Sequence, residues 1–477
     1  MTEAGDGLPA GWSVTLDPEV RRTDAGRTLI GGTPLRVLRF TEAGARWLGG
    51  LADGGGVPGS EAARTLARRL VDGGQAVPHP VAPVQHTAAD VAVVVPVRDD
   101  PDGLRATLAS LGDVGEVVVV DDGSLDADAV RRVVAERPGT VVLRNEASGG
   151  PASARQRGWR TTDRAVVAFV DAEVQLPAGW LTALVAHLDA PGIAAVAPRI
   201  RAAPGDAPGW LHRYESARFP LDLGPLAGPV RPGARVSYVP TTVLVVRRDA
   251  LERVGGFDEA LRVGEDVDLV WRLVDQGLGV RFEPAVAATH PCRPGATAAL
   301  RQRFAYGTSA ASLAARHGGA GAPLGISRLS GVAWLAALVG HPELTAVVAV
   351  GTTAALVPKL ESVDHPISEA VRIGLSGHGH AGAAVAEALR RTWLPLVALF
   401  GGRVRRARPA LVAAVVVPHL LEWRTLPTGL DPVRWTALRV ADDLAYGTGV
   451  WAGCLRARSA RALLPRFAGA VGRPAAP

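Results

Sequence analysis

The sequence has few cysteines and almost no lysine, and both shortages exclude classes of protein. Only Cys292 and Cys454 occur among 477 residues, so cysteines alone can form neither a disulfide framework nor a zinc cluster. Lys359 is the only lysine, and arginine supplies the rest of the basic charge. These arginines are scattered rather than blocked, so the net charge of +6 indicates solvated surface residues rather than a nucleic-acid partner.

The sequence also lacks an obvious secretion signal and a long apolar run. The stretch MTEAGDGLPAGW carries acidic residues and no apolar core, so we expect a cytoplasmic active site. The apolar stretches 343–357 and 410–423 are shorter than the roughly 20 residues of a spanning helix, and Pro418 is expected to interrupt the second. Arginine clusters flank an apolar piece within 390–408. We expect a packed helical region over 295–477, with a module bound to the cytoplasmic face of the cell membrane as the alternative.

The length and the hydrophobic share of 48% predict two or three domains. Residues 1–80 show short strand patterns, then two helices that Thr41 and Ser60 can cap, then an extended piece. This order is winged-helix-like. A proline-rich linker is expected at 81–88, and residues 89–294 form the next block.

This second block alternates valine-rich runs with helical patterns. The runs are VAVVVPV (91–97), EVVVVDD (116–122), TVVLRNE (140–146) and AVVAFVD (165–171). Near-continuous apolar runs are typical of strands that are buried on both faces. Repeated strand–helix units therefore predict an α/β fold with a doubly wound, mostly parallel sheet.

Polar residues follow the first two of these strands, at the edge where such sheets bind ligands. Pro96 and Asp99 end the first run, and Asp121 and Asp122 end the second. Together they are suited to binding a nucleoside, although turns and helix caps also use aspartate. Ser124 is expected to cap the following helix.

A glycine-rich turn, NEASGGPASARQRG (145–158), opens a helix that carries Arg155 and Arg157. Small residues, a helix N-terminus and arginine together favour an anion such as a diphosphate. A simple strand–helix turn with exposed arginines remains the alternative.

Two carboxylates separated by one residue follow the fourth strand. Asp171 and Glu173 lie on the same side of an extended segment, so both can face one cation. Mg²⁺ or Mn²⁺ held by few protein oxygens plus substrate phosphates needs this arrangement. His290, at the end of a later strand, could be a third ligand. The alternatives are a solvated acidic loop and a structural histidine.

Three acids crowd the start of a predicted helix in VGEDVDLVWRL, namely Glu265, Asp266 and Asp268. The helix dipole stabilises acids at this position, but three exceed what capping needs. One of them could act as a general base for a substrate hydroxyl.

Six motifs occur in the order seen in family 2 glycosyltransferases of the GT-A fold: VVVPVRDD, VVVVDDGS, GGPASARQRG, FVDAEVQLPAGWL, GGFDEALRVGEDVDLVWRL and ATH. The resemblance implies inverting transfer of a sugar from a nucleotide donor. It implies that Asp121 binds the nucleotide base and that Asp171, Glu173 and His290 bind the metal. It assigns the base to Glu265 or Asp266. The second metal acid of this family is usually aspartate, so Glu173 leaves the identity of the metal open.

Longer stretches, among them RTLIGGTPLRVLRFTEAGARWLGGL and RPGARVSYVPTTVLVVRR, resemble the mycofactocin biosynthesis glycosyltransferases over nearly the whole chain. That resemblance implies UDP-glucose as donor, premycofactocin as acceptor and a β-1,4-glucan product on this peptide-derived redox cofactor. The first block is similar to the winged-helix peptide-recognition modules of such pathways, which implies an acceptor or a pathway protein as its partner.

Three other functions are weighed against this one. A nucleotidyltransferase would need a lysine-bearing phosphate loop after the first strand, and PVRDDPDG is no such loop. A family 2 enzyme with a cell-envelope glycan or lipid acceptor would carry the same motifs. A non-catalytic peptide-binding scaffold would not need the acids Asp121, Asp171, Glu173 and Asp266.

Overall fold

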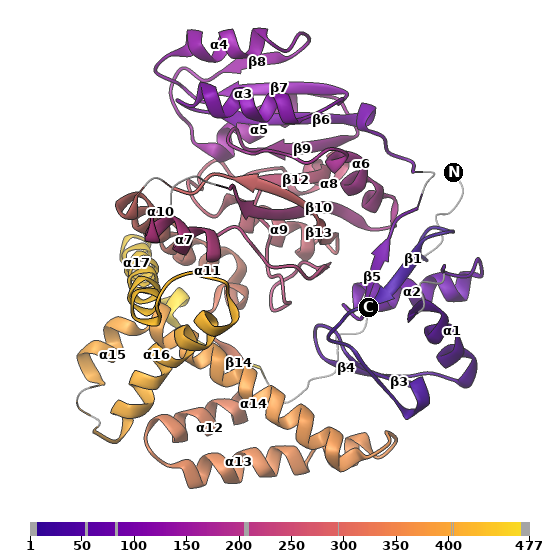
Figure 1. Ribbon diagram of the computed structural model, residues 1–477, viewed down its shortest axis with the longest axis vertical. Helices are drawn as coiled ribbons and strands as arrows, with labels where there is room; N and C mark the ends of the chain where they lie inside the picture. The colour runs from indigo at the N-terminus through magenta and orange to yellow at the C-terminus, as the bar shows by residue number, and fades with distance from the viewer. Residues whose placement is uncertain are drawn as a thin grey trace. The chain divides into compact units, whose positions relative to one another are not determined.

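The computed structural model describes residues 7–52, 56–81, 84–204, 209–293, 295–401, 403 and 405–468 (Figure 1). The chain divides into two compact units. One comprises Met1–Asp206 and Arg218–Cys292, and the other comprises Ala207–Ala217 and Arg293–Pro477. The predicted boundaries at residues 80, 88 and 294 stay predictions.

The N-terminal part of the first unit has the predicted order of strands, two helices and a final strand. Thr41 and Ser60 cap the helices as predicted, because their hydroxyls accept hydrogen bonds from the N–H groups of Gly44 and Ala63. Only the second strand was not predicted. The elements are β1 (Ser13–Leu16), β2 (Arg21–Thr23), β3 (Thr28–Gly31), β4 (Arg36–Arg39), α1 (Glu42–Ala52), α2 (Glu61–Asp72) and β5 (Ala76–His79).

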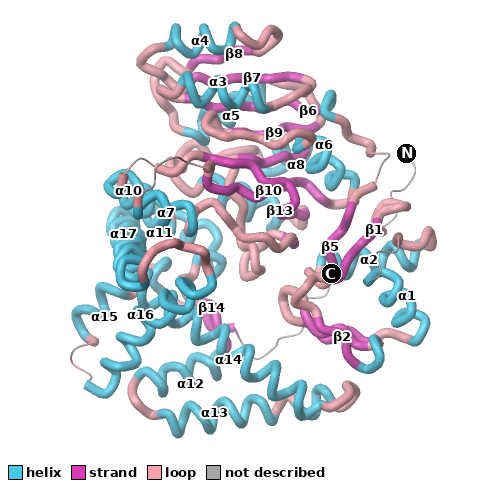
Figure 2. Tube along the Cα trace, in the orientation of Figure 1, coloured by secondary structure: helices cyan, strands magenta, loops and turns pink. Residues whose placement is uncertain are grey.

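An eight-stranded sheet forms the centre of the first unit (Figure 2). Its order is β11-β13-β10-β12-β9-β6-β7-β8, and β9, β6, β7 and β8 run parallel. The predicted mostly parallel sheet is confirmed, with β12 as an antiparallel insertion between β9 and β10. The strands are β6 (Val91–Val97), β7 (Glu116–Asp121), β8 (Val141–Arg144), β9 (Val166–Val170), β10 (Ile193–Ala202), β11 (Gly228–Pro229), β12 (Val243–Arg247) and β13 (Gly279–His290).

Helices cover this sheet and leave the valines of β6, β9 and β12 buried, whereas Val141 and Val142 of the edge strand β8 are exposed (Figure 1). One of these helices, α5, approaches β6 and β7 closely because it carries Gly158. A Cβ at this position would lie 2.3 Å from the side chain of Val94, so only glycine permits the contact. The helices are α3 (Pro101–Ser110), α4 (Ala127–Ala135), α5 (Pro151–Thr161), α6 (Trp180–Val185), α8 (Arg248–Val254) and α9 (Glu265–Asp275).

The second unit is helical, as predicted. Pro418 does not interrupt α16, contrary to the prediction, and the helix continues through it. The elements are α7 (Trp210–Ala217), α10 (Ala296–Thr308), α11 (Ala310–His317), β14 (Gly325–Ser327), α12 (Arg328–Leu338), α13 (Pro342–Ala354), α14 (Pro366–Arg391), α15 (Leu394–Phe400), α16 (Arg408–Thr425), α17 (Pro432–Arg456) and β15 (Arg466–Ala468).

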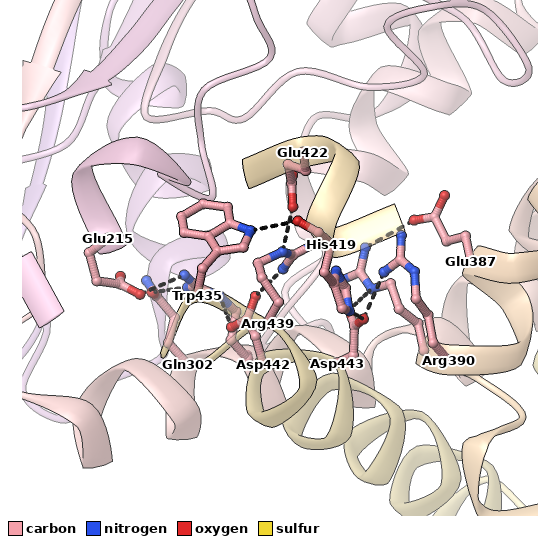
Figure 3. Close-up of polar contacts among 12 residues, drawn as sticks. Glu215, Gln302, Glu387, Arg390, His419, Glu422, Trp435, Arg439, Asp442 and Asp443 are labelled. Carbon is pink, nitrogen blue, oxygen red and sulfur yellow. Dashed lines mark hydrogen bonds and ion pairs between the residues drawn. The ribbon is translucent and has the colours of Figure 1, made fainter. Parts of the chain in front are cut away.

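Alternating buried charges hold α7, α10, α16 and α17 together inside this unit (Figure 3). Arg303 pairs with Glu215 at 3.0 Å and with Asp442 at 2.7 Å. Arg439 pairs with Asp442 at 3.1 Å and with Glu422 at 2.8 Å. Each buried charge thus meets an opposite one, which offsets the cost of removing it from water.

Asp443 forms a second buried cluster on α17. It pairs with Arg390 at 2.7 Å and with His419 at 3.2 Å. Burial opposes ionisation of this carboxyl, but the bond to His419 and the charge of Arg390 outweigh burial and lower its pKa to about 2. The carboxylate is therefore the form that the fold stabilises.

One stretch of the described residues, Pro342–Leu360, is long and apolar enough to cross a membrane by length and composition. Its mean hydropathy is 1.3 and only 6% of the stretch is buried. An apolar helix of this kind normally lies in a protein core or in lipid.

Candidate active site

The predicted acids lie at one edge of the sheet. Asp121 is the last residue of β7, and Asp99 and Asp171 follow the carboxyl ends of β6 and β9. These strands run parallel, with β6 between the other two, so their carboxyl ends share an edge. Pro96 is the last but one residue of β6 and lies opposite Val120 of β7, close to the same edge.

Asp121 is buried and accepts a hydrogen bond from the N–H of Ser124 at 2.8 Å. Its second oxygen pairs with Arg144, at the end of β8. The Ser124 hydroxyl accepts from the N–H of Asp99 at 3.0 Å, so it does not cap α4 as predicted. Asp126 takes that role by accepting from Ala129.

Asp122 points into the glycine-rich loop. Its oxygens accept hydrogen bonds from Asn145, Ser148, Gly149 and Gly150 at 2.6–3.0 Å. Burial opposes ionisation, but these bonds outweigh burial and lower the pKa of Asp122. The carboxylate therefore fixes the loop, and its predicted contact with a donor stays a prediction.

Arg155 joins two of the predicted acids that lie far apart in the sequence. It donates to Asp171 at 2.6 Å and to Glu265 at 2.9 Å. Burial opposes its charge, but Asp171 and Glu265 outweigh burial and raise the pKa of Arg155. Its guanidinium carbon also lies 5.9 Å from the ring centroid of Phe257. Arg157, predicted beside it, instead donates to the backbone oxygen of Arg144, at the end of β8, and to the side-chain oxygen of Asn145.

The three acids of α9 have different surroundings. Asp268 is buried and pairs with Arg272 at 2.8 Å, so it stabilises the helix. Glu265 is bound by Arg155. Asp266 is half-buried and accepts only the N–H of Val267 among its described hydrogen bonds.

Asp266 carries the perturbed pKa that a general base needs. Burial, and then the negative charge of Glu265, raise its pKa from 3.8 to about 7. A carboxyl with such a pKa changes its protonation state near neutral pH, which suits proton transfer.

Glu173 and His290 meet because the chain after β9 pairs with the end of β13. Gln175 and Thr289 exchange backbone hydrogen bonds of 2.9 Å. The His290 Nε2 atom then lies 3.9 Å from Glu173. Its Nδ1 atom lies 2.8 Å from the carbonyl oxygen of Pro291, and a proton on Nδ1 leaves Nε2 as an acceptor.

The residues Asp171, Glu173 and His290 fit an Mn²⁺ or Mg²⁺ ion for which a substrate supplies the remaining ligands. Within the described ranges, no three His, Cys, Asp or Glu side chains form a metal-binding group by themselves. Mg²⁺ and Mn²⁺ need only one or two carboxylates when phosphate oxygens complete the shell. The partly exposed carboxylates of Glu173 and Asp171, 32% and 26% exposed, leave access for such a ligand.

Sequence reasoning missed two residues at this edge. Arg144 pairs with Asp121. Its position at the end of a predicted strand could have indicated that it lies at this edge of the sheet. The ring of Phe219 lies 5.9 Å from that of His290. No pattern in the sequence pointed to this contact, because it depends on a loop returning to β13.

Comparisons with known proteins agree with this geometry. The model of glycosyl transferase family 2 matches residues 92–255. The pre-mycofactocin glycosyltransferase of Mycobacterium tuberculosis is 37% identical over 471 residues, which cover 96% of this chain and 98% of the relative. Glycosyltransferase AglE of Haloferax volcanii is 25% identical over 212 residues, 43% of this chain and 67% of the relative.

Among solved structures, the mannosyltransferase PcManGT from Pyrobaculum calidifontis, in complex with GDP-Man and Mn²⁺, aligns with a TM-score of 0.43 and 20% identity. The alignment covers 81% of this chain and 92% of that one.

The parallel sheet with acids along its carboxyl edge and the family model together define a family 2 glycosyltransferase of the GT-A fold. Within that class, the near-complete alignment with the relative from Mycobacterium tuberculosis is decisive. The chain belongs to the family of pre-mycofactocin glycosyltransferases.

Proposed function

We propose that this chain transfers glucose from UDP-glucose to premycofactocin with inversion, and so builds a β-1,4-linked glucan on this peptide-derived molecule. The relative's activity supports the acceptor, and the motif resemblance supports the donor. The observation that carries the proposal is the bond of Arg155 to both Asp171 and Glu265, because it brings the predicted metal acid to the start of α9, where Asp266 follows Glu265.

The donor is held at the carboxyl edge of β6, β7 and β9. Asp121 and Asp99 accept hydrogen bonds from the nucleoside, and Pro96 lines the same edge. The diphosphate lies near Asp171, where the positive charge of Arg155 attracts it. Asp122 keeps the glycine-rich loop in the shape that this binding needs.

Asp171, Glu173 and His290 would hold Mn²⁺ or Mg²⁺ together with the donor diphosphate. When bound, the ion neutralises the negative charge that develops on the departing UDP. The residues themselves orient the diphosphate so that the bond to the sugar C1 points toward the acceptor.

Asp266 acts as the base. Its carboxylate takes the proton of the acceptor hydroxyl, and the hydroxyl oxygen attacks C1 of glucose from the face opposite UDP. The bond between C1 and the diphosphate oxygen breaks, and its electron pair leaves with UDP. One displacement converts the α-linked donor into a β-linked product. Glu265 is the weaker candidate because Arg155 already occupies it.

The test is a mass-spectrometric assay of purified protein with UDP-glucose, Mn²⁺ and premycofactocin. We expect products that grow by hexose units, with β anomeric couplings by NMR. Transfer only to a lipid or a cell-envelope glycan would replace the acceptor, and no transfer with any acceptor would favour a binding scaffold.

We also propose that the second unit associates with the membrane and that the active site of the first unit lies in the cytoplasm. The helices α12, α13 and α14 pack against one another and expose large apolar side chains. We define the apolar face as Leu335, Val347, Val350, Ile367 and Leu375, each 61–68% exposed. The exposed Arg405 and Arg406 add the positive charge that anionic lipids attract.

Vesicle sedimentation tests this part. The protein should sediment with vesicles of phosphatidylglycerol and phosphatidylcholine, and Val347→Glu with Val350→Glu should abolish sedimentation. Arg131→Glu, a distant charge change on α4, is the control. Equal sedimentation of all three proteins would exclude the apolar face as the contact.

A further inference from the structure

The segment 218–224 returns to the sheet beside His290, which is a predicted metal ligand. This segment belongs to the first unit, whereas the helix α7 that precedes it belongs to the second. The ring centroid of Phe219 lies 5.9 Å from that of His290, and the two ring planes are tilted by 44°. Both residues are buried, with 6% exposure each. The distance and the tilt are typical of ring pairs that pack together inside proteins.

The contacts of the His290 nitrogens do not by themselves fix the plane of the imidazole. Its Nδ1 atom lies 2.8 Å from the carbonyl oxygen of Pro291, and its Nε2 atom lies 3.9 Å from Glu173. The terminal torsion of a histidine has broad minima, so a ring bonded through Nδ1 can still turn. Phe219 packs against the ring and restricts this rotation.

An ion pair fixes the turn that carries Phe219. Asp222 accepts two hydrogen bonds from the guanidinium of Arg199 on β10, at 2.7 and 2.8 Å. The N–H of Asp222 donates to the carbonyl oxygen of Phe219 at 3.1 Å, and its carboxylate accepts the N–H of Gly224 at 2.9 Å. A bidentate pair adds geometric specificity, so the turn has a defined position on β10.

The register of the sheet places the ion pair close to the histidine. The strands β10 and β13 run parallel, with Arg199 opposite Ala287 and Ala202 opposite His290. Arg199 and His290 are thus separated by three residues along neighbouring strands, which is about 10 Å. The turn 219–222 spans this interval, because Asp222 reaches Arg199 and Phe219 reaches His290.

We propose that Phe219, held by the pair of Asp222 and Arg199, is a positioning residue for His290. It keeps Nε2 near Glu173, so that both side chains can bind one Mn²⁺ or Mg²⁺ ion. The inference rests on the proposed function, because it takes His290 as a metal ligand. Phe219 itself acts only through the imidazole. It limits the rotation of the ring before the metal binds, so less freedom is lost on binding.

The first experiment measures the Mn²⁺ affinity of the full chain by electron paramagnetic resonance in the presence of UDP. Phe219→Ala should weaken Mn²⁺ binding about tenfold, whereas Phe219→Leu, which keeps an apolar side chain against the imidazole, should stay within about threefold of the wild type. Asp222→Asn leaves the apolar core intact and should also weaken Mn²⁺ binding, because the turn loses its ion pair. Unchanged affinity in both Phe219→Ala and Asp222→Asn would overturn the proposal.

The matched control is Leu48→Ala, which truncates a fully buried side chain on α1. Like Phe219→Ala, it removes apolar contacts and should lower the melting temperature, but it should leave the Mn²⁺ affinity unchanged. An equal loss of Mn²⁺ affinity in Leu48→Ala would show a general effect of destabilisation and contradict the positioning role.

A double-mutant cycle tests whether Phe219 acts through His290. In a chain that already carries His290→Ala, Phe219→Ala should cause no further loss of Mn²⁺ affinity, because the imidazole that it positions is gone. Additive losses would contradict the proposal. A loss in His290→Ala without one in Phe219→Ala would overturn this inference and leave the metal site in place, whereas no loss in His290→Ala would overturn the metal site as well.

Discussion

Replacing the proposed base, Asp266→Asn, tests chemistry and stability in one variant. In the unfolded chain this carboxyl ionises near its ordinary pKa of 3.8, whereas in the folded chain its pKa is about 7. Between these values the folded state binds more protons than the unfolded state, so the stability of the wild type falls as pH rises from about 4 to 7. Above pH 7 the full cost of ionising Asp266 is present.

The size of this cost follows from the difference in pKa. Three pH units correspond to at most about 4 kcal/mol. Asp266 is half-buried, so water screens it and we expect about 1–2 kcal/mol. Asparagine cannot ionise, so the variant should melt roughly 2–6 °C higher than the wild type at pH 8 and at the same temperature at pH 4.

The same variant should lose transfer while it keeps its donor. Loss of a general base lowers kcat by roughly 10²–10⁴-fold, and UDP-glucose affinity should stay within about threefold because Asp266 does not hold the donor. In the wild type, kcat/KM should rise with pH to a plateau above about 7, since the base works as a carboxylate.

Calorimetry at both pH values and initial rates from pH 5 to 9 check these expectations. Asp128→Asn on α4 is the matched control, because that carboxylate is 71% exposed and should change neither the melting temperature nor the rate. Turnover within threefold of wild type in Asp266→Asn would refute Asp266 as the base and turn attention to Glu265.

Further expectations concern the metal site and the buried charges. His290→Ala should weaken Mn²⁺ binding in the presence of UDP by roughly 10–100-fold, measured by electron paramagnetic resonance; unchanged affinity would remove it from the site. Arg155→Met should lower the free energy of unfolding by about 3–5 kcal/mol, because Asp171 and Glu265 lose their cation; the exposed Arg131→Met is the control in urea titrations, and an equal effect would contradict this reasoning. Wild-type stability should fall by about 2 kcal/mol between pH 4 and 2 because the native carboxylate of Asp443, with a pKa of about 2, becomes protonated. Asp443→Asn should lack this part of the fall. Identical acid profiles of the two proteins would show that the buried cluster does not stabilise this carboxylate.

The course of the sheet was largely predictable from local sequence. The run VAVVVPV became β6 at the predicted residues, because a strand buried on both faces leaves a continuous apolar signal. The antiparallel direction of β12 was not predictable, since its residues VLVVR look the same in either direction. Its direction shows only in its pairing with β9 and β10, which local sequence does not report.

The points at which helices end were harder to predict than the helices themselves. Pro418 was expected to end a helix, because proline lacks an N–H and crowds the preceding turn. The helix α16 nevertheless continues, and it packs against α14 and α17. Such long-range packing can outweigh a local preference, and local sequence does not report it.

The positions of the site acids were predictable, but their partners were not. Parallel strands bring Asp99, Asp121 and Asp171 to one edge, and the motif order indicated this. The partners that saturate Asp122 come from a loop more than twenty residues away, so sequence could not separate this structural acid from Asp121. Likewise, the choice between Glu265 and Asp266 depends on the side chain that Arg155 reaches.

The central claim is that carboxylates from separate strands hold a metal and a nucleotide donor at one edge of the sheet. Calorimetric titration of UDP-glucose with Mn²⁺ and with a chelator, in the wild type and in Asp171→Ala, tests it most directly. The account predicts that Mn²⁺ strengthens donor binding at least tenfold in the wild type and has no effect in the variant. Donor affinity that is independent of both Mn²⁺ and Asp171 would contradict it.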